Sequence, residues 1–161
     1  MTFATRTMIS LMTMLPVAAA ADGLAQAKQT IFGMDCAPCA YGIEKGLGAL
    51  AGVESVTVSL NDGYAEVLFN SDAKTTVEEI REVIRNNGFS PRETSVRVSG
   101  CLVVASGGDA ELQSGGFRYR LRTGDVRLEK ALKSRGGTEV ELTGNVPADS
   151  SEELVVTAIG N

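Results

Sequence analysis

The chain has 161 residues, with 15 Lys and Arg against 20 Asp and Glu, and a formal net charge of −5. It contains no His, no Trp and three Cys. The lack of His excludes Ser-His-Asp and Cys-His catalysis, zinc held by imidazole and a histidine pH switch. The acidic balance argues against general nucleic-acid binding, which depends on Lys and Arg that neutralise phosphates. The chemistry is therefore expected at the cysteines.

The first 27 residues have the composition of a secretory signal peptide. Arg6 precedes an apolar run at 8–21, which is shorter than the roughly 20 residues needed to cross a bilayer. An A-x-A cleavage site ends at Ala27. We expect a cut after Ala27, with a cut after Ala20 or Ala21 and an uncleaved, buried N-terminal helix as alternatives. Cleavage predicts a periplasmic or secreted protein with no membrane insertion afterwards.

Residues 28–94 are expected to form a first domain with the order strand, helix, strand, strand, helix, strand. Alternating or helically spaced apolar residues indicate strands at 29–32, 56–60 and 64–69 and a helix at 38–51. Asn61-Asp62-Gly63 predicts a hairpin turn between the second and third strands. This βαββαβ order is typical of a ferredoxin-like α+β sandwich, a four-stranded antiparallel sheet with both helices on one face.

The second helix of this domain has start and stop signals of its own. Thr75 and Glu78 have the spacing of a capping box, and Asn87-Gly88 is typical of a helix end. Between them, Val77, Ile80 and Ile84 form the expected buried stripe.

Residues 95–161 are expected to form a second domain, a small OB-like β-barrel. Strand patterns occupy 96–105, 117–122, 139–146 and 153–159, and a short helix is expected at 126–134, capped by Asp125. Four strands with one short helix suggest a small Greek-key barrel. No linker separates the two domains, so we expect them to be in contact.

The candidate site is the loop Gly33-Met34-Asp35-Cys36-Ala37-Pro38-Cys39, which joins the first strand to the first helix. Two intervening residues allow both sulfurs to turn toward one point at the helix N-terminus, where unpaired N–H groups and the helix dipole favour thiolates. Paired thiolates suit Cu(I), Hg(II), Cd(II) or Zn(II) better than hard cations.

This loop, together with Gly52-Val53-Glu54-Ser55-Val56-Thr57-Val58 and the ending Gly88-Phe89, resembles the heavy-metal-associated domain family of copper chaperones, metal-transporting ATPases and the periplasmic mercury-binding protein. The resemblance covers residues 28–94. It implies that Cys36 and Cys39 bind the metal ion and pass it to a membrane transporter or another acceptor. It also implies that Met34 braces the loop from the core and that Phe89 lies beside the loop.

Asp35 is a third candidate ligand, because zinc, cadmium and lead transporters of the family often carry Asp at this position. An oxygen ligand suits divalent ions better than linear Cu(I). The alternative interpretation of Asp35 is a carboxylate that only interacts with the helix dipole.

Two other interpretations of the cysteine pair remain open. Cys-Ala-Pro-Cys at a helix start is also similar to the thioredoxin-type redox motif, which would make the chain a thiol-disulfide oxidoreductase. The other is that the pair forms a purely structural disulfide in an oxidising compartment.

Cys101 and a run of arginines complete the candidates. Cys101 is either a small buried hydrophobe, an intermolecular disulfide partner or a third thiol that reaches the metal loop. Arg118, Arg120 and Arg122 alternate with apolar residues, which places them on one strand face. Residues 95–161 hold 8 Lys and Arg against 9 Asp and Glu, so we expect a solvated face or contact with the acidic first domain instead of nucleic acid.

The sequence therefore predicts an exported carrier of a soft metal ion, with no enzymatic activity of its own. A thiol-disulfide oxidoreductase is the first alternative. An adaptor, whose barrel binds a protein partner while the first domain senses metal, is the second.

Overall fold

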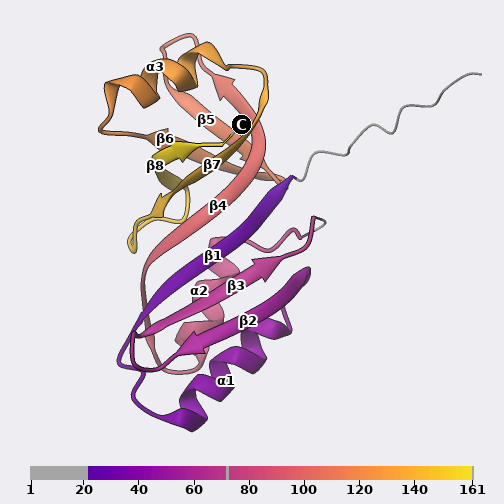
Figure 1. Ribbon diagram of the computed structural model, residues 1–161, viewed down its shortest axis with the longest axis vertical. Helices are drawn as coiled ribbons and strands as arrows, with labels where there is room; N and C mark the ends of the chain where they lie inside the picture. Colours follow the sequence, from indigo (N-terminus) through magenta and orange to yellow (C-terminus); the bar gives the residue numbers. More distant parts are fainter. Residues whose placement is uncertain (1–21, 72, 161) are drawn as a thin grey trace, which may run out of the picture.

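The computed structural model describes residues 22–71 and 73–160, which form two stacked halves joined by one long strand (Figure 1). Residues 1–21, which carry most of the expected signal peptide, lie outside the described residues. None of the helices in the described part of the chain is both long and apolar enough to span a bilayer.

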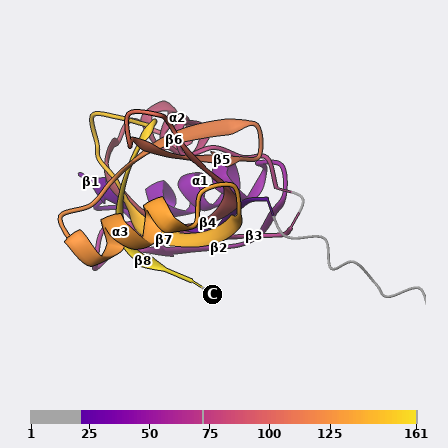
Figure 2. The ribbon, with the colours of Figure 1, turned by 90° about the horizontal axis from the view of Figure 1, so that it is seen from above.

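The first half, called here the α/β unit, is a four-stranded sheet with two helices on one face (Figures 1 and 2). The sheet order is β2-β3-β1-β4, and every pair in it is antiparallel. The arrangement confirms the expected βαββαβ sandwich. Its elements are β1 (Gly23–Phe32), α1 (Ala37–Gly48), β2 (Val53–Ser59), β3 (Tyr64–Phe69), α2 (Val77–Asn86) and the first part of β4 (Ser90–Val104).

The capping box of α2 lies one residue later than the sequence pattern indicated. The backbone N–H of Glu79 donates to Thr76 Oγ1, and the Glu79 carboxylate accepts from the Thr76 N–H at 2.7 Å. Thr75, predicted as the cap, donates instead to the carbonyl of Ala51 at 2.7 Å and is buried. Both threonines precede a Glu by three residues, so spacing alone could not separate them.

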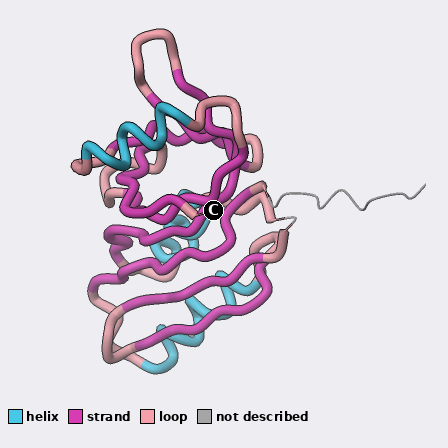
Figure 3. Tube along the Cα trace, turned by 45° about the horizontal axis from the view of Figure 1, so that its top comes forward, coloured by secondary structure: helices cyan, strands magenta, loops and turns pink. Residues whose placement is uncertain are grey.

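The second half, called here the barrel, is a closed ring of five strands, visible in the upper part of Figure 3. Its order is β4-β5-β6-β8-β7, closed by pairing of β7 with β4, and β6 runs parallel to β8. This connectivity is compatible with the expected OB-like barrel. Its elements are the second part of β4 with β5 (Ala110–Ser114), β6 (Phe117–Arg122), α3 (Val126–Ser134), β7 (Glu139–Val146) and β8 (Glu153–Ile159).

The strand β4 belongs to both halves, as Figure 1 shows. Residues 94–99 pair with β1 on one edge and with β7 on the other, and residues 101–104 pair with β5. The expected domain boundary between 94 and 95 therefore falls inside a continuous strand, and the buried hydrophobic side chains of both halves form one cluster.

The strand β1 begins five residues earlier than the signal-peptide interpretation allowed. Leu24 is 4% exposed and Ala27 is fully buried, and both pair with β4. Asp22 Oδ1 accepts a hydrogen bond of 2.8 Å from the N–H of Gly115 in the barrel. A cut after Ala27 would remove half of this strand, whereas the alternative cut after Ala20 or Ala21 would leave it whole.

Candidate metal centre

The cysteine loop lies at the end of the α/β unit that faces away from the barrel, where β1 leads into α1 (Figure 1). Gly33 takes a positive φ of +90°, a conformation that side chains disfavour, and so turns the chain out of the sheet. Met34 then enters the core at 7% exposure, while Asp35 stays exposed. The burial of Met34 fixes the loop from below and leaves the next residues at the surface.

The helix α1 begins at this loop with a sulfur as its cap. Cys36 is the N-cap residue, and the backbone N–H of Cys39 donates to Cys36 Sγ at 3.2 Å. Pro38 occupies the first turn, where its missing N–H leaves no hydrogen bond unmade. The structure joins Cys36 and Cys39 in a disulfide with their Cα atoms 5.2 Å apart.

Asp35 completes a group of three potential ligands with the two cysteines. One carboxylate oxygen of Asp35 and the Sγ atoms of Cys36 and Cys39 all lie within 4.8 Å of one another. Both cysteines are half-buried and Asp35 is exposed, so the group opens to solvent on one side. Once the disulfide is reduced, two thiolates and one carboxylate offer a partly soft, three-ligand site with room for a further ligand from another molecule.

Aromatic side chains flank this group. Phe89 packs against the core beside Gly33, since a Cβ at Gly33 would lie 4.0 Å from Phe89 Cδ1. Phe32 is 65% exposed beneath the guanidinium of Arg92, 5.0 Å from the ring centre. Tyr41, two residues after Cys39, is 61% exposed. Phe32 and Tyr41 therefore expose aromatic surface on either side of the loop along the chain.

Cys101 does not reach the loop of its own chain. Phe32, just before the loop, pairs with Ser90 at the start of β4, and Cys101 lies eleven residues further along the same strand. Strand geometry places the two about 35 Å apart. The hypothesis of a third thiol ligand within one chain is therefore wrong. Cys101 is a half-buried free thiol on β4, opposite Gln113 on the neighbouring strand β5 and Glu139 on the neighbouring strand β7.

The three arginines of β6 point outward, each toward a glutamate. Arg118 lies 3.6 Å from Glu111, and Arg120 and Arg122 lie 3.5 and 3.2 Å from Glu152 and Glu153. The charges are thus locally balanced, and the face is solvated. Among the described residues, the ion pairs of these arginines all stay within the barrel and none reaches the α/β unit.

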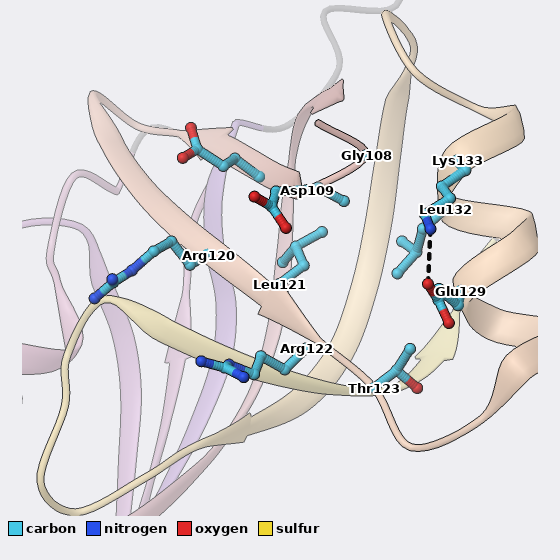
Figure 4. Close-up of a pocket in the computed structure, with 11 residues that line it drawn as sticks. Gly108, Asp109, Arg120, Leu121, Arg122, Thr123, Glu129, Leu132 and Lys133 are labelled. Atoms are coloured by element: carbon cyan, nitrogen blue, oxygen red, sulfur yellow. Dashed lines mark hydrogen bonds and ion pairs between the residues drawn. The ribbon is translucent and has the colours of Figure 1, made fainter. Parts of the chain in front are cut away.

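A cleft of about 500 Å³ lies beside these arginines, between the β5–β6 edge and α3 (Figure 4). Leu121 and Leu132 form its apolar floor, and an ion pair of 2.7 Å between Lys133 and Glu129 borders it. Asp109 extends into the opening. Its charged side chains are exposed or already paired, so it presents no buried polar group to a ligand.

Arg81 is a buried charged residue that the sequence patterns above did not identify. Arg81 is 1% exposed on the inner face of α2. The signal was available, since Arg81 lies four residues after Val77 and three before Ile84, at the helical spacing of the buried stripe. An arginine in that position requires buried acceptors from another segment.

The comparisons with known proteins point to the same part of the chain. The family model described as "Heavy-metal-associated domain" matches residues 30–90. A copper-transporting ATPase of Helicobacter pylori is 39% identical over 64 residues, which are 40% of this chain and 8% of the transporter. The copper chaperone CopZ of Staphylococcus saprophyticus is 35% identical over 57 residues, 35% of this chain and 82% of the chaperone.

Among solved structures, oxidized MerP from Ralstonia metallidurans is 27% identical, with a TM-score of 0.38 over 41% of this chain and 90% of that one. The chain thus spans less than a tenth of the Helicobacter transporter but most of the chaperone. On the family match and the likeness to the chaperone, this chain belongs to the heavy-metal-associated domain family through residues 30–90.

Proposed function

We propose that this chain is an exported carrier that binds one soft metal ion at Cys36 and Cys39 and passes it to a membrane transporter or another acceptor. The observation that carries the proposal is the convergence of two sulfurs and one carboxylate oxygen within 4.8 Å at the start of α1. The N-terminal N–H groups of the helix lie beside the sulfurs and stabilise the negative charge of thiolates.

Binding requires the reduced pair. A cellular dithiol reduces the Cys36–Cys39 disulfide with two electrons and two protons and is itself oxidised to a disulfide. The metal ion then displaces the two thiol protons, so its affinity rises with pH. Transfer follows by exchange of ligands, in which acceptor thiolates replace Cys36 and Cys39 one at a time. The site is open to solvent on one side, so an acceptor can approach it there. The exposed rings of Phe32 and Tyr41 offer apolar surface for contact with that acceptor.

Two observations bear on which ion is carried. The relatives are named as copper-transporting or copper chaperone proteins, which favours Cu(I). The carboxylate of Asp35 favours a divalent ion such as Zn(II) or Cd(II), which takes more ligands than linear Cu(I). We propose that Asp35 is a third ligand for divalent ions and does not coordinate Cu(I).

Native mass spectrometry of the reduced protein tests the proposal. The protein is offered Cu(I), Hg(II), Zn(II) and Cd(II) in turn, and one ion per chain is expected. Cys36→Ser and Cys39→Ser are expected to abolish stoichiometric binding, while Cys101→Ser serves as the matched thiol control and keeps it. Stoichiometric binding that survives both loop substitutions would contradict the proposal.

The role of Asp35 needs a separate comparison. Asp35→Asn keeps the shape and removes the charge, and Glu44→Gln makes the same change on an exposed part of α1. Only Asp35→Asn is expected to weaken Zn(II) and Cd(II), by tenfold or more, with Cu(I) unaffected. If both substitutions lowered the Zn(II) and Cd(II) affinities equally, Asp35 would act only through its negative charge and not as a ligand.

The disulfide supports a second candidate, a thiol-disulfide oxidoreductase. Cys36 caps α1 and accepts from the Cys39 N–H, the arrangement that stabilises an attacking thiolate in redox enzymes. Reduction of insulin by the protein, with a dithiol as the electron source, is expected for this function and not for a carrier.

Export is part of the proposal, and the fold bears on how it would occur. The run Ala18-Ala19-Ala20-Ala21 precedes Asp22. A cut after Ala20 or Ala21 satisfies the small-residue rule for signal cleavage and keeps β1 complete. The mass of the protein recovered from the periplasm checks this directly.

A further inference from the structure

A buried arginine connects the two halves of the molecule. Arg81 of α2 is 1% exposed, and its Nη1 donates to the Ser150 carbonyl at 2.8 Å. Its Nη2 donates to the carbonyls of Val146 and Pro147 at 3.0 and 2.8 Å. All three acceptors lie at the end of β7 or in the loop to β8, so the donor comes from the α/β unit and the acceptors from the barrel.

The same network continues across the sheet to β1. Arg81 Nη2 also lies 3.2 Å from Thr94 Oγ1, whose hydroxyl donates to Gln29 Oε1 at 2.6 Å. Gln29 Nε2 in turn donates to the carbonyl of Arg92 at 2.9 Å. Gln29 and Thr94 are fully buried. A continuous chain of hydrogen bonds therefore runs from β1 through β4 and α2 into the barrel.

The charge of Arg81 makes this connection costly to break. No carboxylate within the described ranges pairs with it, and its Nε has no hydrogen-bond partner there. Burial lowers the pKa of Arg81, although the nearby carboxylates of Glu78 and Asp149 act in the opposite direction. If the β7–β8 loop moved away from α2 while both halves stayed folded, the guanidinium of Arg81 would lose its barrel acceptors. The three carbonyls of that segment would lose their donor.

We propose that Arg81 clasps the barrel to the α/β unit so that the two unfold together, and that metal bound at Cys36 and Cys39 thereby stabilises the barrel about 30 Å away. The metal half of this inference rests on the proposed function. A ligand that binds only the folded state stabilises everything that unfolds with its site. The shared strand β4 and the hydrogen bond from the Gly115 N–H to Asp22 add to the same connection.

Two single-tyrosine variants report on the halves separately, because the chain has three Tyr and no Trp. Tyr119 is buried in the barrel at 2% exposure, and Tyr64 lies half-buried on β3. One variant keeps Tyr119 and the other keeps Tyr64, with Phe at the remaining tyrosines. In urea, the two fluorescence midpoints are expected to coincide. With reduced protein and Cd(II) at a hundredfold excess over its Kd, both are expected to rise by the same amount, about 1 M.

Arg81→Met then tests whether the hydrogen bonds of Arg81 to the barrel couple the two halves, and Arg85→Met is the matched control. Arg85 lies one turn later on the same helix and makes only an exposed ion pair with Glu78 at 2.8 Å. Arg81→Met is expected to separate the two midpoints and to confine the Cd(II) response to Tyr64, and Arg85→Met to do neither. If Arg81→Met does not fold, Arg81→Lys, which keeps the charge but not the forked donors, is expected to separate the midpoints less.

Each outcome is decisive. The coupling would be overturned if the two single-tyrosine variants that keep Arg81 unfolded at different urea midpoints, and if Cd(II) raised the Tyr64 midpoint but not the Tyr119 midpoint. Coincident midpoints in folded Arg81→Met would overturn the role of this arginine. Failure of Cd(II) to shift either midpoint would count against the proposed metal binding, while the urea midpoints alone would still decide whether the halves unfold together.

Discussion

A chain that starts at Lys28 should be much less stable than one that starts at Asp22. The truncation removes Leu24 and Ala27, which are 4% and 0% exposed, together with their pairing to β4. Loss of a buried leucine costs about 2–5 kcal/mol, and the lost alanine and strand pairing add about 2 kcal/mol. The expected loss is thus about 4–7 kcal/mol, which is comparable with the whole stability of a small domain.

The assay is urea unfolding of the two chains, followed by tyrosine fluorescence and extrapolated to water. A control chain that starts at Gly23 loses only the Asp22 contact with Gly115 and is expected to fall by about 1 kcal/mol. If the chain from Lys28 were as stable as the chain from Asp22 to within about 1 kcal/mol, the first half of β1 would contribute nothing. The placement of the signal cut before Asp22 would then lose its physical basis.

Three further predictions concern stability. Burial raises the pKa of Tyr119 to about 12 from 10.0, so the folded state keeps the phenol proton that the unfolded state loses. Stability should be constant below about pH 9 and fall by about 2 kcal/mol by pH 12, and Tyr119→Phe should abolish that fall in urea titrations at each pH. Thr76→Ala removes the N-cap of α2 and should lower the free energy of unfolding by about 1 kcal/mol. Thr75→Ser keeps the hydroxyl donor to Ala51 and should lower it by less; equal decreases would contradict the assignment of Thr76 as the cap. Gly52→Ala should lower the thermal midpoint by about 5 °C or more, because Gly52 has φ +79° and a Cβ there would lie 2.5 Å from Ala73 Cα; an unchanged midpoint would contradict this close approach.

Sequence patterns predicted the elements whose signals are local. The helix at 126–134 with Asp125 as its cap, the turn at 61–63 and the strands at 117–122, 139–146 and 153–159 all lie where the patterns place them. The metal loop was also accessible, because Gly, Met, two Cys and Pro each have a local role there. In each case residues within one turn or strand decide the structure.

What the sequence did not reveal depends on distant partners. The strand β5 was missed because Leu112 is its only large apolar residue, and its alternation is completed by small Ala110 and Ser114. The first half of β1 was assigned to the signal peptide, since an A-x-A pattern looks the same in a strand and in a cleavage site. The burial of Arg81 required acceptors 65 to 69 residues away. No local pattern carries that information.

X-ray absorption on reduced protein loaded with one equivalent of Zn(II) tests the central claim most directly. The account predicts two sulfur neighbours at about 2.3 Å from the metal and oxygen neighbours at about 2.0 Å. It also predicts that Cys101→Ser leaves this spectrum unchanged, whereas Cys36→Ser, which abolishes stoichiometric binding, no longer shows the shell of two sulfurs. A shell of oxygen and nitrogen alone, or two sulfurs that persist in Cys36→Ser, would contradict the claim that this loop holds the ion.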